Sequence, residues 1–203
     1  MTGVTRRRLL TGAAVAVLAA ACTRDDEAVG PAGDLDTAAT AAALEKLALD
    51  HYTGTSRAAT DGKLGAAIPP AVATFFVTAA GHHRAAMDSW NALLTAAGRA
   101  PVTAPNDKLR LVVDTAAVKV TDIPAAATLA LRLEDYASQT YQKAIPTLER
   151  PDVVRLAAEI ALVGHQRQAV LRYLLGLDPV GSGTDRQPAA LPPSDPNPRL
   201  ITG

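Results

Sequence analysis

The sequence has little cysteine and few aromatic residues, and it has no excess charge of either sign. Its 203 residues include one cysteine, Cys22, which excludes an internal disulfide, a cysteine-based metal cluster and a dithiol redox pair. Basic and acidic residues balance at 20 each, so the chain has no basic excess of the kind that binds nucleic acid. We therefore expect no nucleic-acid partner and a fold stabilised by packing.

Aromatic residues make up 3% of the chain, whereas hydrophobic residues make up 48%. Alanine supplies much of the apolar content, and alanine with leucine favours closely packed helices over a sheet, which is rich in branched and aromatic side chains. A chain of this length suits one compact domain with accessory segments. The composition therefore predicts a single all-α domain.

The first 22 residues have the pattern of a bacterial export signal. A basic segment containing Arg6 and Arg7 precedes an uncharged apolar stretch, residues 9–21, and small residues then lead to Cys22. The stretch is shorter than the about 20 apolar residues that span a bilayer. The paired arginines before two leucines resemble a twin-arginine signal. The residues before Cys22 resemble a lipobox, although Ala19 stands where leucine is preferred.

These features predict cleavage before Cys22 and attachment of a lipid to its side chain. Residues 1–21 are then an export signal peptide, and residues 22–35, which are polar and contain glycine and proline, are a lipidated tether. The expected location is the outer face of the cytoplasmic membrane, and the membrane is the expected partner. The alternative is an ordinary secretory signal and a secreted protein. The sequence identifies no protein partner.

Start and stop signals within residues 36–176 predict four long helices. Short turns within each pair and a long connection at residues 99–122 predict an antiparallel four-helix bundle with a crossover. A short helix inside the connection is one option. Residues 177–203 are rich in proline and predict a flexible tail. The expected helices run from Asp36-Thr37 to Asp61-Gly62, Pro69-Pro70 to Gly98, Thr121-Asp122 to Leu148, and Pro151-Asp152 to Gly176.

Helical periodicity places several polar side chains on apolar faces. Glu45, His83 and Glu134 each share a face with alanine, leucine or aromatic residues, so we expect all three to point inward. His165 lies about half a turn from the bulky stripe of its helix and is a weaker candidate. Because a buried carboxylate is costly unless it is paired, hydrogen-bonded or bound to metal, the two glutamates need partners.

The two halves of the predicted bundle repeat one pattern. Glu45 and Tyr52 are seven residues apart, as are Glu134 and Tyr141, and each pair precedes a helix with one candidate histidine. Over about residues 37–176, this pattern resembles the ferritin-like superfamily, particularly its exported bacterial members. In that superfamily, one glutamate from each of two helices and a Glu-x-x-His motif from each of the others bind a di-iron or di-manganese centre.

The resemblance implies ligands at some positions and departs from the family at others. Ala80 and Leu162 stand where the motif places its two bridging glutamates, so a bridged two-metal centre is not expected. The remaining set suits one Fe, Mn or Zn ion, or none. The metal ligands that the resemblance implies are Glu45, His83, Glu134 and His165.

Three functional hypotheses follow. The first is a non-catalytic binding or structural lipoprotein with a degenerate metal centre, in which Tyr52 and Tyr141 complete a buried hydrogen-bond network. The second is a metal-binding protein, or an oxidase or peroxide-handling enzyme, with a mononuclear site. The third is a partner-binding module of the cell envelope. No serine or cysteine nucleophile with a positioned base is evident, so we assign no catalytic residue and favour the first hypothesis.

Overall fold

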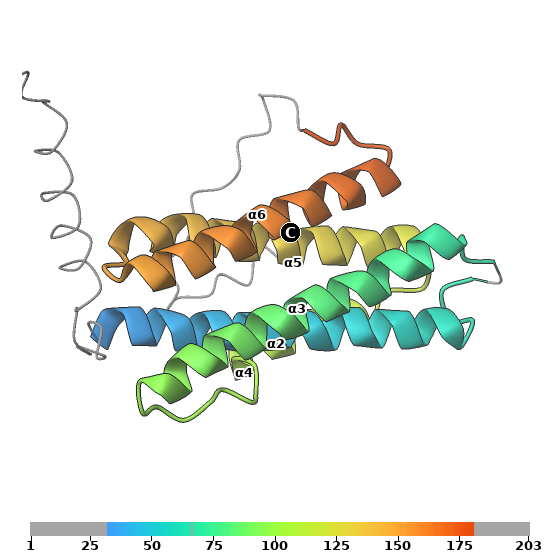
Figure 1. Cartoon of the computed structure of the whole chain (residues 1–203). Coiled ribbons are helices and arrows are strands. Elements are labelled where there is room, and N and C mark those ends of the chain that lie inside the picture. Colours follow the sequence, from blue (N-terminus) through green and yellow to red (C-terminus); the bar gives the residue numbers. More distant parts are fainter. Residues whose placement is uncertain (1–31, 66, 181–203) are drawn as a thin grey trace, which may run out of the picture.

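A computed structural model describes residues 32–65 and 67–180 (Figure 1). The regular secondary structure of these residues is entirely helical. The predicted signal peptide, the lipidation site Cys22 and the tail beyond residue 180 lie outside these residues. No described helix is both long enough and apolar enough to span a bilayer. The elements are α2 (Ala32–Thr60), α3 (Pro70–Ala96), α4 (Asp107–Ala117), α5 (Ile123–Ala144), the 3₁₀ turn η1 (Ile145–Thr147) and α6 (Pro151–Leu174).

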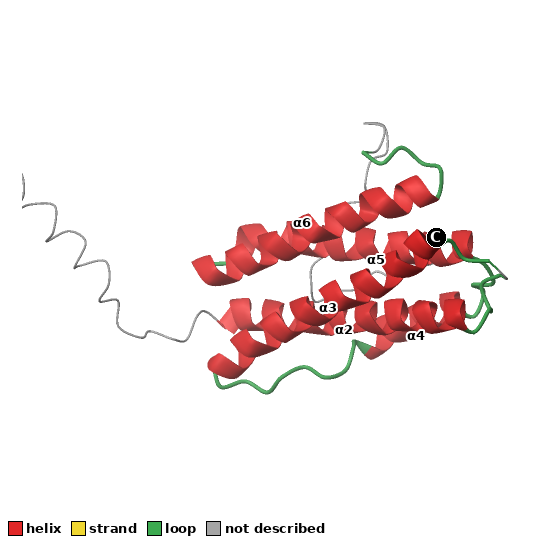
Figure 2. Cartoon of the chain, turned by 45° about the vertical axis from the view of Figure 1, so that its right-hand side comes forward, coloured by secondary structure: helices red, strands yellow, loops and turns green. Residues whose placement is uncertain are grey.

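The four long helices form a helical bundle made of two pairs. α2 packs along α3, and α5 packs along α6. The two pairs lie one above the other in both views (Figures 1 and 2), and they meet through contacts of α2 with α5 and of α3 with α6. Each long helix therefore has one face toward the middle of the bundle.

Most helix ends coincide with the local signals of the sequence. Pro70 and Pro151 occupy the first positions of α3 and α6, where the missing N–H costs nothing. The side chain of Asp122 accepts a hydrogen bond from the N–H of Ala125 at 2.8 Å and so caps α5. Two residues after α3, Gly98 adopts a φ of 74°, a conformation that glycine tolerates without strain.

The third long helix ends in a tighter turn. We predicted a helix that ends by Leu148; α5 ends at Ala144, and a 3₁₀ turn follows at residues 145–147. Pro146 explains the change, because proline has no N–H to donate to the carbonyl four residues earlier. The tighter 3₁₀ turn then closes the helix before α6 begins.

The first helix begins at Ala32, four residues before the expected start at Asp36, so the last residues of the predicted tether are helical. Asp34 is 1% exposed and lies inside this first turn. Its carboxylate accepts hydrogen bonds from the backbone N–H groups of Glu149, at 3.2 Å, and Arg150, at 2.9 Å. This contact joins the start of α2 to the start of α6, which explains why the helix extends beyond its sequence signal.

The long connection between α3 and α5 contains the short helix α4. Asn106 caps α4, because its side-chain oxygen accepts the N–H groups of Lys108 and Leu109, both at 3.1 Å. Leu109 and Val113 are buried and belong to the same apolar cluster as residues of α2 and α5. α4 therefore closes the side of the bundle on which these two helices meet.

The core combines many alanines with leucines and a few large aromatic side chains. Phe76 and Trp90 on α3 are both fully buried, and each belongs to a separate apolar cluster. His83 lies seven residues from each of them and so falls on the same face of α3 between the two clusters. Alanines let the helices approach closely, and those that are at most 1% exposed are Ala38, Ala42, Ala79, Ala126, Ala127, Ala130 and Ala157.

Candidate functional site

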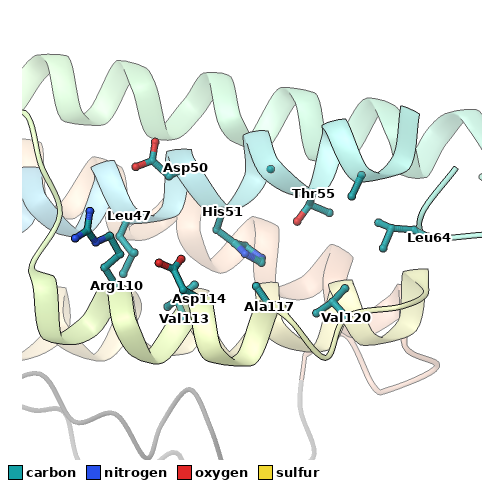
Figure 3. Close-up of a pocket in the computed structure, with 12 residues that line it drawn as sticks. Leu47, Asp50, His51, Thr55, Leu64, Arg110, Val113, Asp114, Ala117 and Val120 are labelled. Atoms are coloured by element: carbon teal, nitrogen blue, oxygen red, sulfur yellow. The ribbon is translucent and has the colours of Figure 1, made fainter. Parts of the chain in front are cut away.

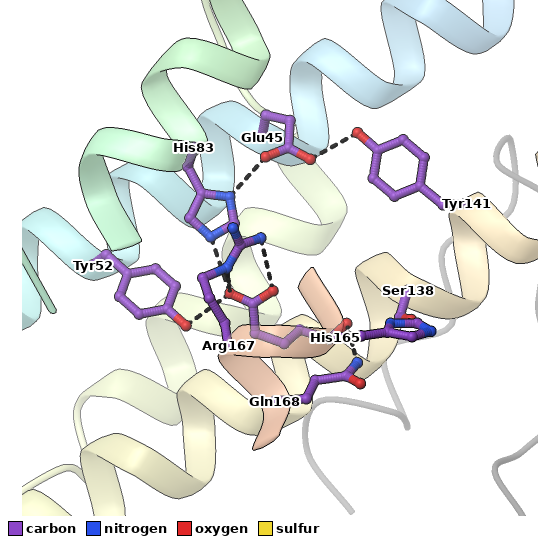
Figure 4. Close-up of polar contacts among 9 residues, drawn as sticks. Glu45, Tyr52, His83, Ser138, Tyr141, His165, Arg167 and Gln168 are labelled. Atoms are coloured by element: carbon purple, nitrogen blue, oxygen red, sulfur yellow. Dashed lines mark hydrogen bonds and ion pairs between the residues drawn. The ribbon is translucent and has the colours of Figure 1, made fainter. Parts of the chain in front are cut away.

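A polar centre lies in the middle of the bundle, where each long helix contributes one inward side chain (Figure 4). Glu45 comes from α2, His83 from α3 and Glu134 from α5, as the sequence predicts. The fourth is Arg167 of α6, which the sequence analysis did not identify. The first three are 1% exposed and Arg167 is 5% exposed, so the group is closed to solvent.

His83 links the two carboxylates. Its Nδ1 lies 2.7 Å from Oε2 of Glu45, and its Nε2 lies 3.0 Å from Oε1 of Glu134. An imidazole donates from both nitrogens only when both carry a proton. Burial alone lowers the pKa of His83, but its hydrogen bonds to Glu134 and Glu45 and their negative charges outweigh burial and raise it. His83 is therefore an imidazolium held between two carboxylates.

Arg167 holds the other side of Glu134. Its Nε donates to Oε1 at 2.7 Å and its Nη2 donates to Oε2 at 3.0 Å, which is the bidentate fork that guanidinium and carboxylate groups favour. Burial would raise the pKa of Glu134, but the hydrogen bond and charge of His83 and the charge of Arg167 lower it to about 2. Glu134 is therefore ionised throughout the physiological range.

The two tyrosines complete the network across the repeat. Tyr52 donates to Oε1 of Glu134 at 2.8 Å, and Tyr141 donates to Oε1 of Glu45 at 2.7 Å. Each tyrosine thus caps the glutamate of the other half of the chain. Trp90 in turn donates from Nε1 to the hydroxyl of Tyr141 at 3.0 Å. Burial raises the pKa of both tyrosines well above the ordinary value, with a further increase from the carboxylates, so both remain donors.

The charges of the centre cancel. Two carboxylates are balanced by the imidazolium of His83 and the guanidinium of Arg167. All four carboxylate oxygens of Glu45 and Glu134 accept at least one hydrogen bond. Buried ionic groups are tolerated when they are paired and fully hydrogen-bonded, and this network meets both conditions.

The structure does not bring His165 to the centre. Its Nδ1 lies 2.9 Å from Oγ of Ser138 and its Nε2 lies 3.3 Å from Nε2 of Gln142, on an exposed face of α6. Residues that are two positions apart in an α-helix differ by about 200° around the helix axis. His165 and Arg167 therefore point in nearly opposite directions. Leu162, three residues before His165, is likewise 63% exposed. The inward face of α6 is therefore not the one that contains His165.

The register of α6 determines which of its residues face Glu134. Gly164 is buried, and a Cβ added there would lie 3.7 Å from Oε2 of Glu134 and 3.8 Å from Nη2 of Arg167. On both helices a small residue stands three positions before the inward basic side chain: Ala80 before His83 on α3, and Gly164 before Arg167 on α6.

A sequence signal for this register exists, but it is weak. Most buried positions of α6 are separated by three, four or seven residues, as in an inward stripe. Several of these residues are small or polar, whereas the larger apolar residues of α6 lie to one side of the stripe. The stripe consists of Val153, Ala157, Gly164, Arg167, Gln168 and Leu171.

The donor set of the centre does not fit a metal ion. Both nitrogens of His83 are engaged with carboxylates, and both oxygens of Glu134 are engaged with the guanidinium of Arg167, itself a fixed cation. Among residues 32–65 and 67–180, no cluster of three or more histidine, cysteine, aspartate or glutamate side chains has an arrangement that could hold a metal. The described centre can fix and stabilise the four helices, because it joins all of them through charged hydrogen bonds.

Comparison with known proteins agrees with the fold. The model of the family described as Ferritin-like domain matches residues 33–177, which is most of the chain and covers the helices described above except for the first residue of α2. No curated protein and no solved structure matches the sequence. The match spans Glu45, His83, Glu134 and Arg167, and the chain belongs to the ferritin-like domain family.

Proposed function

We propose that this protein is a non-catalytic binding or structural lipoprotein, in which a salt-bridge network replaces the metal centre of the ferritin-like fold. The observation that supports this role is the bidentate contact of Arg167 with Glu134, at 2.7 and 3.0 Å. The guanidinium supplies a permanent positive charge at a position where the family motif has a metal-binding histidine. A protein that holds its own cation there has no open position for a substrate or for oxygen.

Charge balance supports this interpretation. In the family centre, four glutamates and two neutral histidines surround two divalent ions, so the negative and positive charges are equal. Here two glutamates have been lost, and the remaining two are balanced by His83 and Arg167. The buried centre is thus electrically neutral without a metal, and adding a divalent ion would leave it with excess positive charge.

The proposed architecture is an antiparallel four-helix bundle in which α4 lies within the long crossover connection. The proposed location is the outer face of the cytoplasmic membrane, with a lipid on Cys22. Cys22 precedes the first residue of α2, Ala32, by ten positions. A segment of that length reaches at most roughly 35 Å, so the start of α2 would stay within that distance of the bilayer.

Metal titration of the full chain tests the proposed centre. We expect no stoichiometric binding of Fe²⁺, Mn²⁺ or Zn²⁺ under anaerobic conditions, measured by calorimetry and by metal analysis after desalting. The matched variant is Glu45→Ala with Glu134→Ala, which removes both carboxylates. Stoichiometric metal in the wild type that is lost in this variant would contradict the proposal and support the mononuclear alternative.

A reverse substitution tests the register. Ala80→Glu, Gly164→Glu and Arg167→His together recreate Glu-x-x-His on both α3 and α6. We expect this variant to bind close to two divalent ions per chain. The control carries glutamine at residues 80 and 164, which keeps the size of the new side chains but removes their charge. A folded triple variant that binds no metal would show that Gly164 and Arg167 do not occupy the motif positions.

Fractionation of producing cells tests the proposed location. We expect the wild-type chain in the membrane fraction and a Cys22→Ala variant released from it, because the variant lacks the thiol that carries the lipid. Replacing Arg6 and Arg7 with lysines should retain the precursor inside the cell if the twin-arginine pathway exports it. Wild-type protein found only in the medium would instead support the secreted alternative.

A further inference from the structure

A cavity of about 350 Å³ lies between α2 and α4, on the side of α2 where the short helix covers the bundle (Figure 3). It is separate from the four charged residues of the polar centre, none of which lines it. Cavities of this size fall within the usual range for small-molecule sites. The apolar part of its wall is formed by Leu47, Ala58, Leu64, Val113, Ala117 and Val120.

His51 is the polar group in the wall of this cavity that lacks a partner. Its ring extends from α2 toward α4 (Figure 3), and its Nε2 is buried with no hydrogen-bond partner in the described part of the chain. Burial, with a smaller effect from the charge of His83, lowers the pKa of His51 to about 4. At neutral pH the ring is therefore an uncharged imidazole with one donor and one acceptor.

An unpaired ring nitrogen in this position is unfavourable, because a buried polar group loses its hydrogen bonds to water. The neighbouring protein groups leave Nε2 unpaired, and the cavity is the space beside the ring that a partner could enter. A 180° rotation of the imidazole about χ2 would exchange the positions of its ring nitrogens and ring carbons. Thr55, one helical turn further along α2, adds a hydroxyl to the same wall. The cavity thus combines an apolar interior with uncharged hydrogen-bonding groups.

Charges at the cavity argue against an anionic ligand. Asp50, Asp114 and Arg110 line it, and Arg110, the basic residue of this wall, is already paired with Asp107 at 3.0 Å. Asp50 is paired with Lys46 at 2.6 Å. A neutral His51 supplies no positive charge to attract or hold an anion inside.

We propose that this cavity binds a small uncharged molecule that has an apolar ring or short chain and a hydroxyl group, with the hydroxyl paired to His51. A hydroxyl both donates and accepts, so it suits either tautomer of the ring. An apolar cavity of about 150 Å³ is enough for benzene, and the present one accommodates a substituted ring. This site is independent of the polar centre and goes beyond the proposed function.

Titration of the full chain with benzyl alcohol tests the site. With ¹⁵N-labelled histidine, the ring signals of His51 should shift and saturate, while those of the distant, exposed His165 should stay constant. Benzoate, which has a similar ring but a negative charge, should bind at least tenfold more weakly. His51→Leu should weaken binding of benzyl alcohol about tenfold, the loss expected for one hydrogen bond to a buried group.

A cavity-filling variant locates the binding. Ala117→Phe adds a ring to the α4 side of the cavity and should abolish saturation, whereas Val118→Phe, at the neighbouring position that is 84% exposed, should bind like the wild type. Linear shifts without saturation in the wild type would mean that water alone fills the cavity, and they would overturn the proposal. Unchanged affinity in Ala117→Phe or in His51→Leu would also overturn it. None of these three results depends on metal binding at the polar centre.

Discussion

Replacing Arg167 with methionine should destabilise the protein more than any single surface substitution on α6. Methionine keeps an unbranched side chain of similar length, so the chief change is the loss of the guanidinium. Glu134 loses hydrogen bonds at 2.7 and 3.0 Å, and the buried centre changes from a net charge of zero to one negative charge. The cost is therefore that of an uncompensated buried carboxylate.

The size of the effect follows from the burial of the pair. Because Glu134 is 1% exposed and Arg167 is 5% exposed, solvent cannot replace the lost partner. Breaking one side of such a pair costs about 3–5 kcal/mol. In a domain of this size 1 kcal/mol corresponds to roughly 2–4 °C, so we expect a fall in Tm of roughly 6–20 °C.

Urea unfolding followed by circular dichroism measures this cost. Arg155→Met, at an exposed position on the same helix, is the control and should stay within about 0.5 kcal/mol of the wild type. Adding Glu134→Gln to Arg167→Met should recover part of the loss, since Glu45 and His83 then balance each other. A loss below about 1 kcal/mol for Arg167→Met, or no recovery in the double variant, would refute the charge-balance reasoning.

Three further perturbations probe other parts of the structure. The raised pKa of His83 means that its stabilising contribution is complete below about pH 6.5 and is lost as the pH rises through the folded-state value. The free energy of unfolding should therefore fall as the pH rises above about 6.5, and it should fall less steeply in His83→Gln. The depressed pKa of Glu134, about 2, predicts the opposite loss as the pH falls below about 4.5, which acid unfolding of Glu134→Gln would test. Asn106→Ala should cost about 1 kcal/mol in chemical unfolding, because α4 loses its cap.

The sequence predicted three of the four central side chains because each lies on a clear apolar face. Glu45 and Glu134 share their faces with alanine and tyrosine at regular spacing, and His83 lies between Phe76 and Trp90. At such positions the helical period alone determines which side chains point inward. The four long helices were predictable for the same reason, since their ends carry proline, glycine or a capping aspartate.

The sequence could not show how α6 is rotated or where α2 begins. On α6 many of the larger apolar residues lie beside the inward stripe. The buried positions include Gly164 and Arg167, and both residue types have low hydrophobicity. The start of α2 depends on the contact of Asp34 with Arg150, 116 residues away. Both features arise from packing between distant parts of the chain; local periodicity indicates the rotation of α6 only weakly and does not indicate the start of α2.

In the proposed salt-bridged centre, Gly164 and Arg167 of α6 make physical sense together with Glu134. A glutamate at residue 164 would place a third carboxylate against Glu134, where a Cβ alone comes within 3.7 Å of its Oε2. Without a metal ion, that added charge has no further counter-ion in the closed core, so a small uncharged residue at position 164 suits the proposed salt-bridged centre. Conversely, Arg167 would be an unpaired cation if Glu134 were lost. Under the proposed function, a single substitution toward the family motif should therefore destabilise the centre, whereas substitution of all three positions should create a metal site.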